Sequence, residues 1–138
     1  MGKAANSSIS LKQIHVTDNF WNKYVHLVKD VIIPYQWDIL NDKLEDVETS
    51  HCIENFKIAA GEKEGEFQGA VFQDTDVAKW LEAVGFVLNY ARDEKLEELA
   101  DETIELIGRA QQPDGYLNTY FTIKEPDGRW SNLMEGHE

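Results

Sequence analysis

The chain has one cysteine, Cys52, among its 138 residues. A single thiol excludes an intrachain disulfide framework and a zinc cluster built from several cysteines of this chain. No apolar run approaches the roughly 20 residues that a membrane-spanning helix needs. The first eight residues also lack the apolar segment of a signal peptide. We therefore expect a cytoplasmic protein that has no membrane partner.

Positive charge is also scarce, since 13 Lys and Arg residues face 26 Asp and Glu residues and the formal net charge is −13. This balance disfavours nucleic acid, which proteins bind with clustered Lys and Arg, and it disfavours an anionic membrane surface. With 42% hydrophobic residues, the chain is too apolar for a disordered acidic tail. Its length fits one domain.

What the chain does have is apolar residues at helical spacing. Asp18 is placed to cap a helix that begins near Asn19. Pro34 should end or kink this helix, because proline lacks an N–H group and crowds the preceding turn. A second short helix is expected to follow and to run as far as Leu44. The region therefore predicts two helical segments with an end or a kink at the proline.

Three further helices are predicted downstream. Residues 52–60 form the first, with Gly61 just beyond its end. The second has an apolar stripe at helical spacing, and its cap candidates are Asp74, Thr75 and Asp76. The third begins at Asp93 and is closed by Pro113. Its acidic outer face is typical of a solvated surface, and its predicted inward residues are Leu96, Leu99, Ala100, Thr103, Ile104, Ile107 and Ala110.

A long loop rich in aromatic residues follows Pro113. Tyr116, Tyr120, Phe121 and Trp130 lie there among planar hydrogen-bonding side chains. Such rings either pack against the C–H faces of a sugar or anchor the loop in the core, and their alternation allows short strands. We predict an all-α fold of antiparallel helical hairpins, with long loops that include this strand-compatible segment.

Several residues carry functional groups that suit more than one role. The amide of Gln36 can donate to and accept from a sugar hydroxyl, or it can bond a backbone group at the proline kink. His137 and Glu138 match the start of a zinc-protease motif, but the chain stops before the second histidine. Cys52 follows His51 directly, and adjacent helical residues point in different directions. A small buried cysteine is therefore favoured over a nucleophile.

Ordered motifs along the chain resemble the bacterial β-L-arabinofuranosidases of glycoside hydrolase family 127. The matching stretches are Val31-Ile32-Ile33-Pro34-Tyr35-Gln36-Trp37 with Leu40-Asn41-Asp42, then Gly69 to Ala83 with Phe72-Gln73-Asp74-Thr75-Asp76, then Ala110 to Phe121, Arg129-Trp130 and His137-Glu138. The resemblance runs from about Thr17 to the last residue.

The resemblance implies an (α/α)6 toroid and a retaining hydrolase that acts on terminal β-L-arabinofuranosides. It implies a zinc-bound cysteine nucleophile beyond position 138, so we assign no catalytic residue, metal ligand or cofactor to this chain. Among the matching positions, Gln36 and His137 are implied hydroxyl partners. Phe72 and Asp76 are implied neighbours of the sugar pocket, although Asp76 remains mainly a cap candidate.

Residues 17–138 would then form the first part of a truncated catalytic domain, preceded by a flexible segment over residues 1–16. We expect such a chain to bind carbohydrate but to lack hydrolase activity when alone. Helix stripes without their partner helices would favour self-association. The alternative is a complete helical module that binds carbohydrate or protein without catalysis.

Overall fold

The computed structural model describes residues 9–131, and this part of the chain is helical with no strand. Short 3-10 turns occur at η1 (Leu11–Gln13) and η3 (Pro126–Gly128), and a π-helical segment, η2, spans Val28–Ile32. The α-helices are α1 (Asn19–Leu27), α2 (Ile33–Leu40), α3 (Cys52–Ala59), α4 (Asp74–Tyr90), α5 (Glu94–Ala110) and α6 (Thr119–Ile123). The expected all-α fold is confirmed.

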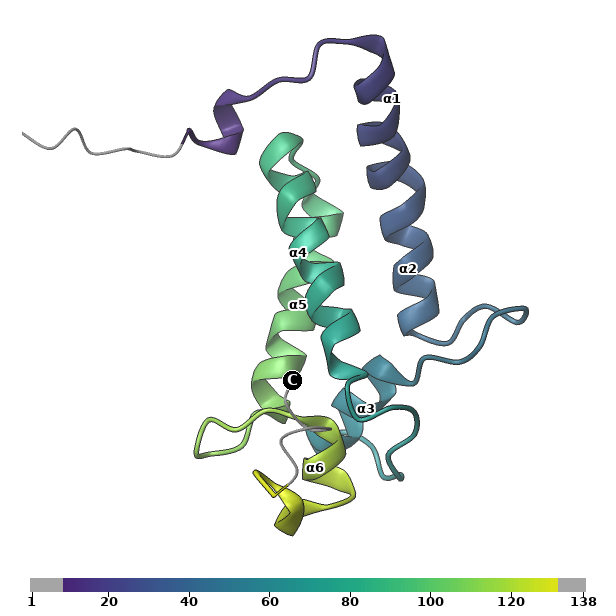
Figure 1. Cartoon of the computed structure of the whole chain (residues 1–138), viewed down its shortest axis with the longest axis vertical. Coiled ribbons are helices and arrows are strands. Elements are labelled where there is room, and N and C mark those ends of the chain that lie inside the picture. The colour runs from purple at the N-terminus through teal and green to yellow at the C-terminus, as the bar shows by residue number, and fades with distance from the viewer. Residues whose placement is uncertain (1–8, 132–138) are drawn as a thin grey trace, which may run out of the picture.

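The long helices lie roughly parallel to one another (Figure 1). Helices α4 and α5 form an antiparallel hairpin, and α1, η2 and α2 join into one rod beside α4. Helices α3 and α6 lie together at the end of the hairpin where α4 begins. This end therefore collects the loops that follow α2, α3 and α5.

Two of the predicted helix starts are confirmed to within one residue, and an aspartate caps each helix. The Asp18 carboxylate accepts a hydrogen bond of 2.7 Å from the backbone N–H of Trp21, so α1 begins at Asn19. The Asp93 carboxylate accepts one of 3.2 Å from Leu96, so α5 begins at Glu94. In both helices an aspartate side chain satisfies a first-turn N–H that has no partner inside the helix.

Of the two outcomes predicted for Pro34, an end of the helix or a kink, the end is wrong, because the helical rod continues through it. It lies in the first turn of α2, and the chain enters it directly from the π-helical segment η2. The N–H of Ile33 donates to the carbonyl of Val28, five residues back. The wider π-helical turn before Pro34 therefore accommodates the proline ring, and the rod continues through this residue.

The predicted extension of α2 to Leu44 is wrong, because the helix ends at Leu40. Asp42 then adopts a left-handed conformation with φ of 55°. Its carboxylate accepts hydrogen bonds from the backbone N–H groups of Ser50 (2.6 Å) and His51 (3.0 Å). Asp42 thus closes the loop between α2 and α3. The helical spacing of apolar residues does not predict this contact, because its partners are eight and nine positions away.

None of Asp74, Thr75 and Asp76 caps α4. Gln73 occupies the cap position in a helical conformation and makes no side-chain cap bond. The backbone N–H groups of Thr75 and Asp76 donate to the carbonyls of Phe72 and Gln73, so a 3-10-type turn satisfies them. The side chains of Asp74 and Asp76 are consequently available for tertiary contacts.

The aromatic segment after Pro113 forms helix α6 rather than short strands. Asn118 caps this helix by accepting a 3.0 Å hydrogen bond from the N–H of Phe121. The Asp74 carboxylate accepts from both the N–H and the hydroxyl of Thr119, each at 2.6 Å. The Asn118 carboxamide and the Asp74 carboxylate thus stabilise the start of α6. The alternation of aromatic residues did not predict this helix.

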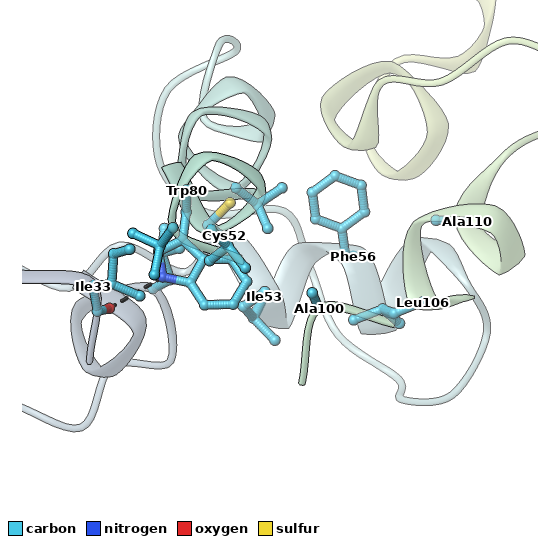
Figure 2. Close-up of a cluster of buried hydrophobic side chains, with 12 residues drawn as sticks. Ile33, Cys52, Ile53, Phe56, Trp80, Ala100, Leu106 and Ala110 are labelled. Carbon is cyan, nitrogen blue, oxygen red and sulfur yellow. Dashed lines mark hydrogen bonds between the residues drawn. The ribbon is translucent and has the colours of Figure 1, made fainter. Parts of the chain in front are cut away.

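The core lies between the α4–α5 hairpin, α3 and the start of α2 (Figure 2). Its buried side chains include Trp80 from α4, Phe56 and Cys52 from α3, and Leu106 from α5. The prediction that Ile104 faces inward is wrong, since 54% of this residue is exposed. Leu106, which was not predicted, is buried because α5 turns that face toward α3.

Candidate binding groove

A groove of about 840 Å³ lies between α2, the start of α4 and the loops that precede α3 and α4. We call it the α2–α4 groove. Three of the four residues that the sequence marked as sugar-binding candidates line it, namely Gln36, Phe72 and Asp76. The fourth, His137, lies outside the described residues. Further lining residues are Val28, Ile32, Ile33, Ile39, Leu40, Glu48, Thr49, Ser50, Gly69, Ala70, Gln73, Lys79, Trp80 and Ala83.

Gln36 is an exposed residue of α2, two positions after Pro34. It lies toward the C-terminal end of the rod, which continues past the proline through the π-helical segment. Its amide supplies both a donor and an acceptor on the α2 side of the groove. Asp76 and Phe72 come from the opposite side, at the start of α4. The groove therefore joins two motifs that are far apart in the sequence.

Asp76 is held by two neighbours at the start of its own helix, the cap residue Gln73 and Lys79. Its Oδ2 accepts a 3.1 Å hydrogen bond from Nε2 of Gln73, and its Oδ1 lies 3.4 Å from Nζ of Lys79. Both contacts leave carboxylate lone pairs for another donor, because each oxygen has two acceptor positions. The arrangement fixes the carboxylate at the groove wall.

Gln73 is a residue of the groove that sequence reasoning did not single out. Its Oε1 accepts from the N–H of Ala70 at 3.4 Å, and its Nε2 reaches Oγ of Ser50 at 3.5 Å in addition to Asp76. Gln73 therefore connects the loop before α3 to the start of α4. No local signal marks this role, because Ser50 is 23 residues away.

The apolar wall of the groove depends on Trp80. Its indole Nε1 donates a 3.1 Å hydrogen bond to the carbonyl of Ile33, and Figure 2 shows this bond between α4 and α2. The ring also packs on Trp37, with centroids 4.5 Å apart. These contacts fix the separation of α2 from α4, and they thus set the width of the groove.

Phe72 is 51% exposed, so its ring offers an apolar face at the groove. The aromatic residues of the later loop are placed elsewhere. Phe121 is buried as a core anchor, and Tyr120 packs edge-on against Phe67. Phe121 is thus an aromatic residue that anchors the loop in the core. The aromatic ring at the groove belongs to Phe72 instead.

Cys52 has no features of a nucleophile or a metal ligand. It is completely buried, and its Sγ donates to the carbonyl of Gln73 at 3.1 Å. Burial, with a further contribution from Asp74, raises the pKa of the Cys52 thiol to about 12. Within residues 9–131, no group of three or more His, Cys, Asp or Glu residues is placed to hold a metal ion. No helix in this range is long and apolar enough to cross a membrane.

Comparisons with known proteins show similarity over most of this chain. The chain is 39% identical over 141 residues to a non-reducing end β-L-arabinofuranosidase of Bifidobacterium longum subsp. longum, and the match covers 91% of this chain and 21% of the relative.

Two solved structures are similar. One is a family 127 β-L-arabinofuranosidase of Geobacillus stearothermophilus, with 62% identity and a TM-score of 0.89 over 91% of this chain and 20% of that chain. The other is a family 127 β-arabinofuranosidase with 29% identity and a TM-score of 0.80 over 94% of this chain and 21% of that chain.

The chain thus spans about a fifth of the length of these relatives. The sequence profile of the β-L-arabinofuranosidase catalytic domain of glycoside hydrolase family 127 matches residues 13–138. On the extent of this match and the shared helical arrangement, the chain belongs to glycoside hydrolase family 127.

Proposed function

We propose that this chain supplies part of the sugar-binding side of a β-L-arabinofuranosidase, and that the α2–α4 groove receives a terminal arabinofuranoside-like sugar. The observation that carries the proposal is the convergence of Gln36, Phe72 and Asp76, from two distant segments, on one groove. The relatives named as arabinofuranosidases support the substrate class.

Each of these three side chains has a distinct task in the proposal. The amide of Gln36 exchanges hydrogen bonds with one sugar hydroxyl, and the Asp76 carboxylate accepts from another. The Phe72 ring packs against an apolar C–H face of the sugar. His137 remains a predicted hydroxyl partner. Gln73 has no direct sugar contact in this scheme, since its amide is engaged by Ala70, Ser50 and Asp76.

We assign none of the catalytic groups of the proposed enzyme to the described residues. Glycoside hydrolysis requires an acid and a nucleophile or base on opposite sides of one bond. Asp74 is committed to Thr119, and Asp76 to Gln73 and Lys79. For the zinc that the family resemblance implies, Cys52 is unsuitable because its buried thiol has a raised pKa of about 12. We therefore assign no zinc-dependent catalytic step to residues of this chain. We also propose a cytoplasmic location and a retaining reaction.

Sugar titration followed by NMR tests the binding role. Methyl β-L-arabinofuranoside should shift the backbone amide signals that surround the groove, and Gln36→Ala should weaken the apparent Kd about tenfold, which corresponds to about 1.4 kcal/mol. Gln68→Ala is the matched control, because Gln68 is exposed and does not line the α2–α4 groove. Equal affinity in the parent chain and in the folded Gln36→Ala and Asp76→Asn variants would remove these residues from the proposed site.

A further inference from the structure

The loop between α2 and α3 contains two residues that adopt the left-handed backbone conformation although neither is glycine. They are Asp42, with φ of 55°, and His51, with φ of 56°. This conformation is sterically unfavourable for a residue that carries a Cβ atom, and it persists only where surrounding contacts hold it. Because the two residues lie at opposite ends of the loop, contacts between them determine the path of the whole segment.

A single carboxylate joins the two ends of this loop. Besides the two backbone bonds that Oδ1 of Asp42 accepts from Ser50 and His51, its Oδ2 lies 3.1 Å from the same N–H group of His51. Nδ1 of the His51 imidazole lies 3.3 Å from this Oδ2. Both side chains are only about a quarter exposed, so water screens their contact less than it screens a surface pair. We call the pair of Asp42 and His51 the loop clamp.

The loop clamp lies directly beside the α2–α4 groove without forming part of its lining. The three residues that precede His51 line the groove, and they are Glu48, Thr49 and Ser50. Ser50 is buried, whereas Glu48 and Thr49 are exposed. The clamp therefore holds the segment that forms one wall of the groove, and it does so from outside the space that a sugar would occupy.

Polar contacts lead from the loop clamp to Asp76, one of the proposed sugar contacts. The Asp42 carboxylate fixes the backbone of Ser50, and Oγ of Ser50 lies 3.5 Å from Nε2 of Gln73. The same Nε2 donates to Asp76 over 3.1 Å. The amide group of Gln73 has two N–H donors, so it can serve both acceptors at once. A displacement of Ser50 would therefore reorient the Gln73 amide and, with it, the Asp76 carboxylate.

We propose that Asp42 and His51 are positioning residues for sugar binding, which act through Ser50 and Gln73 on the carboxylate of Asp76. Asp42 accepts from the loop backbone, and the His51 imidazole supplies a second partner that keeps the Asp42 carboxylate in this orientation. Neither residue touches the sugar. The inference rests on the proposed function, because it assigns the effect of the loop clamp to the sugar affinity of the α2–α4 groove.

Titration of the 138-residue chain with methyl β-L-arabinofuranoside tests the loop clamp in variants that suit the left-handed backbone. Asp42→Gly removes the carboxylate, and glycine adopts this conformation without a steric cost. Asp42→Asn keeps one oxygen acceptor, and asparagine also tolerates the conformation. We expect Asp42→Gly to weaken the apparent Kd about tenfold and Asp42→Asn to restore it to within about threefold of the parent value. His51→Gly, which removes only the imidazole, should weaken it about threefold.

The side-chain amide of Gln73 gives a second readout, which NMR records without sugar. Its N–H signals should move in Asp42→Gly and return toward the parent positions in Asp42→Asn. Glu45→Ala is the matched control, because Glu45 is an exposed carboxylate of the same loop that does not line the groove. It should change neither the signals nor the Kd.

The two readouts separate this inference from the proposed function. A parent chain that binds no sugar would contradict the proposed function, while moved Gln73 signals would still support positioning by the loop clamp. If Asp42→Gly does not fold, His51→Gly is measured in its place, since it keeps the Asp42 carboxylate. Unmoved Gln73 signals or a parent-like Kd in a folded clamp variant would overturn the inference.

Discussion

The carboxylate of Asp74, at the start of α4, accepts two hydrogen bonds from Thr119, at the start of α6. The backbone N–H and the hydroxyl of Thr119 each donate over 2.6 Å, although the two residues are 45 positions apart. Only 1% of Thr119 is exposed, so its donors have no access to bulk water. This pair attaches the loop after α5 to the helix that forms one wall of the α2–α4 groove.

Replacing Asp74 with alanine should destabilise the fold. Both donors of Thr119 would lose their partner in a buried position, and an unsatisfied buried donor costs about 1–3 kcal/mol. We expect Asp74→Ala to lower the free energy of unfolding by about that amount in urea denaturation followed by circular dichroism. Asp101→Ala, on the exposed face of α5, is the control and should change it by less than about 0.5 kcal/mol. Equal stabilities of the two variants would contradict this role for Asp74.

The same carboxylate predicts a pH dependence. Burial raises the pKa of Asp74 above its ordinary value of 3.8, even though the bonds from Thr119 act in the opposite direction. Between 3.8 and the raised value, the folded chain binds more protons than the unfolded chain, so the contribution of Asp74 to stability falls as pH rises. The stability difference between the parent chain and Asp74→Asn should therefore decrease as pH increases from 3.8. A difference that grows over this range would show that the pKa is lowered instead.

Cys52 should be unreactive in the folded chain. Complete burial and a pKa raised to about 12 leave almost no accessible thiolate at pH 8. Ellman's reagent should therefore report no thiol under native conditions and one thiol per chain in guanidinium chloride, since Cys52 is the only cysteine. Rapid native labelling of a full equivalent would contradict the buried position of this side chain.

Trp80 should control the attachment of α2 to α4. The variant Trp80→Phe removes the indole donor and leaves the Ile33 carbonyl without it, which should lower the free energy of unfolding by about 1–3 kcal/mol. Trp21→Phe is the matched control, because Trp21 is 61% exposed on α1. Chemical denaturation of both variants distinguishes the two positions. A comparable loss in the control would show that tryptophan removal as such, rather than the bond to Ile33, is responsible.

The chain should release no arabinose from a β-L-arabinofuranoside when it is assayed alone. Asp74 is engaged by Thr119 and Asp76 by Gln73 and Lys79, and the chain spans about a fifth of the length of its relatives. Reducing-sugar detection after incubation of a homogeneous 138-residue preparation checks this prediction, with the full-length Geobacillus stearothermophilus relative as the positive control. Release above the buffer background by this chain would place a complete catalytic apparatus within it.

Local chemistry in the sequence determined the helical fold and several helix boundaries. Asp18 and Asp93 cap helices whose starts they predict, because a cap bond joins residues only three positions apart. The buried state of Cys52 also followed from the sequence. The candidate groove residues Gln36, Phe72 and Asp76 came from motif resemblance, and their sugar-binding role remains a prediction.

Tertiary structure decided the features that depend on distant partners. Asp74 is a local cap candidate by its position, yet its carboxylate instead accepts from the N–H and the hydroxyl of the buried Thr119, 45 positions away. Pro34 is a helix breaker by its chemistry, yet the wider turn at η2 and the bond from Trp80 to Ile33 keep the rod intact. The α2–α4 groove exists only because the rod and the hairpin pack side by side. This packing brings α2 next to the start of α4, and the spacing of residues in the sequence does not predict that proximity.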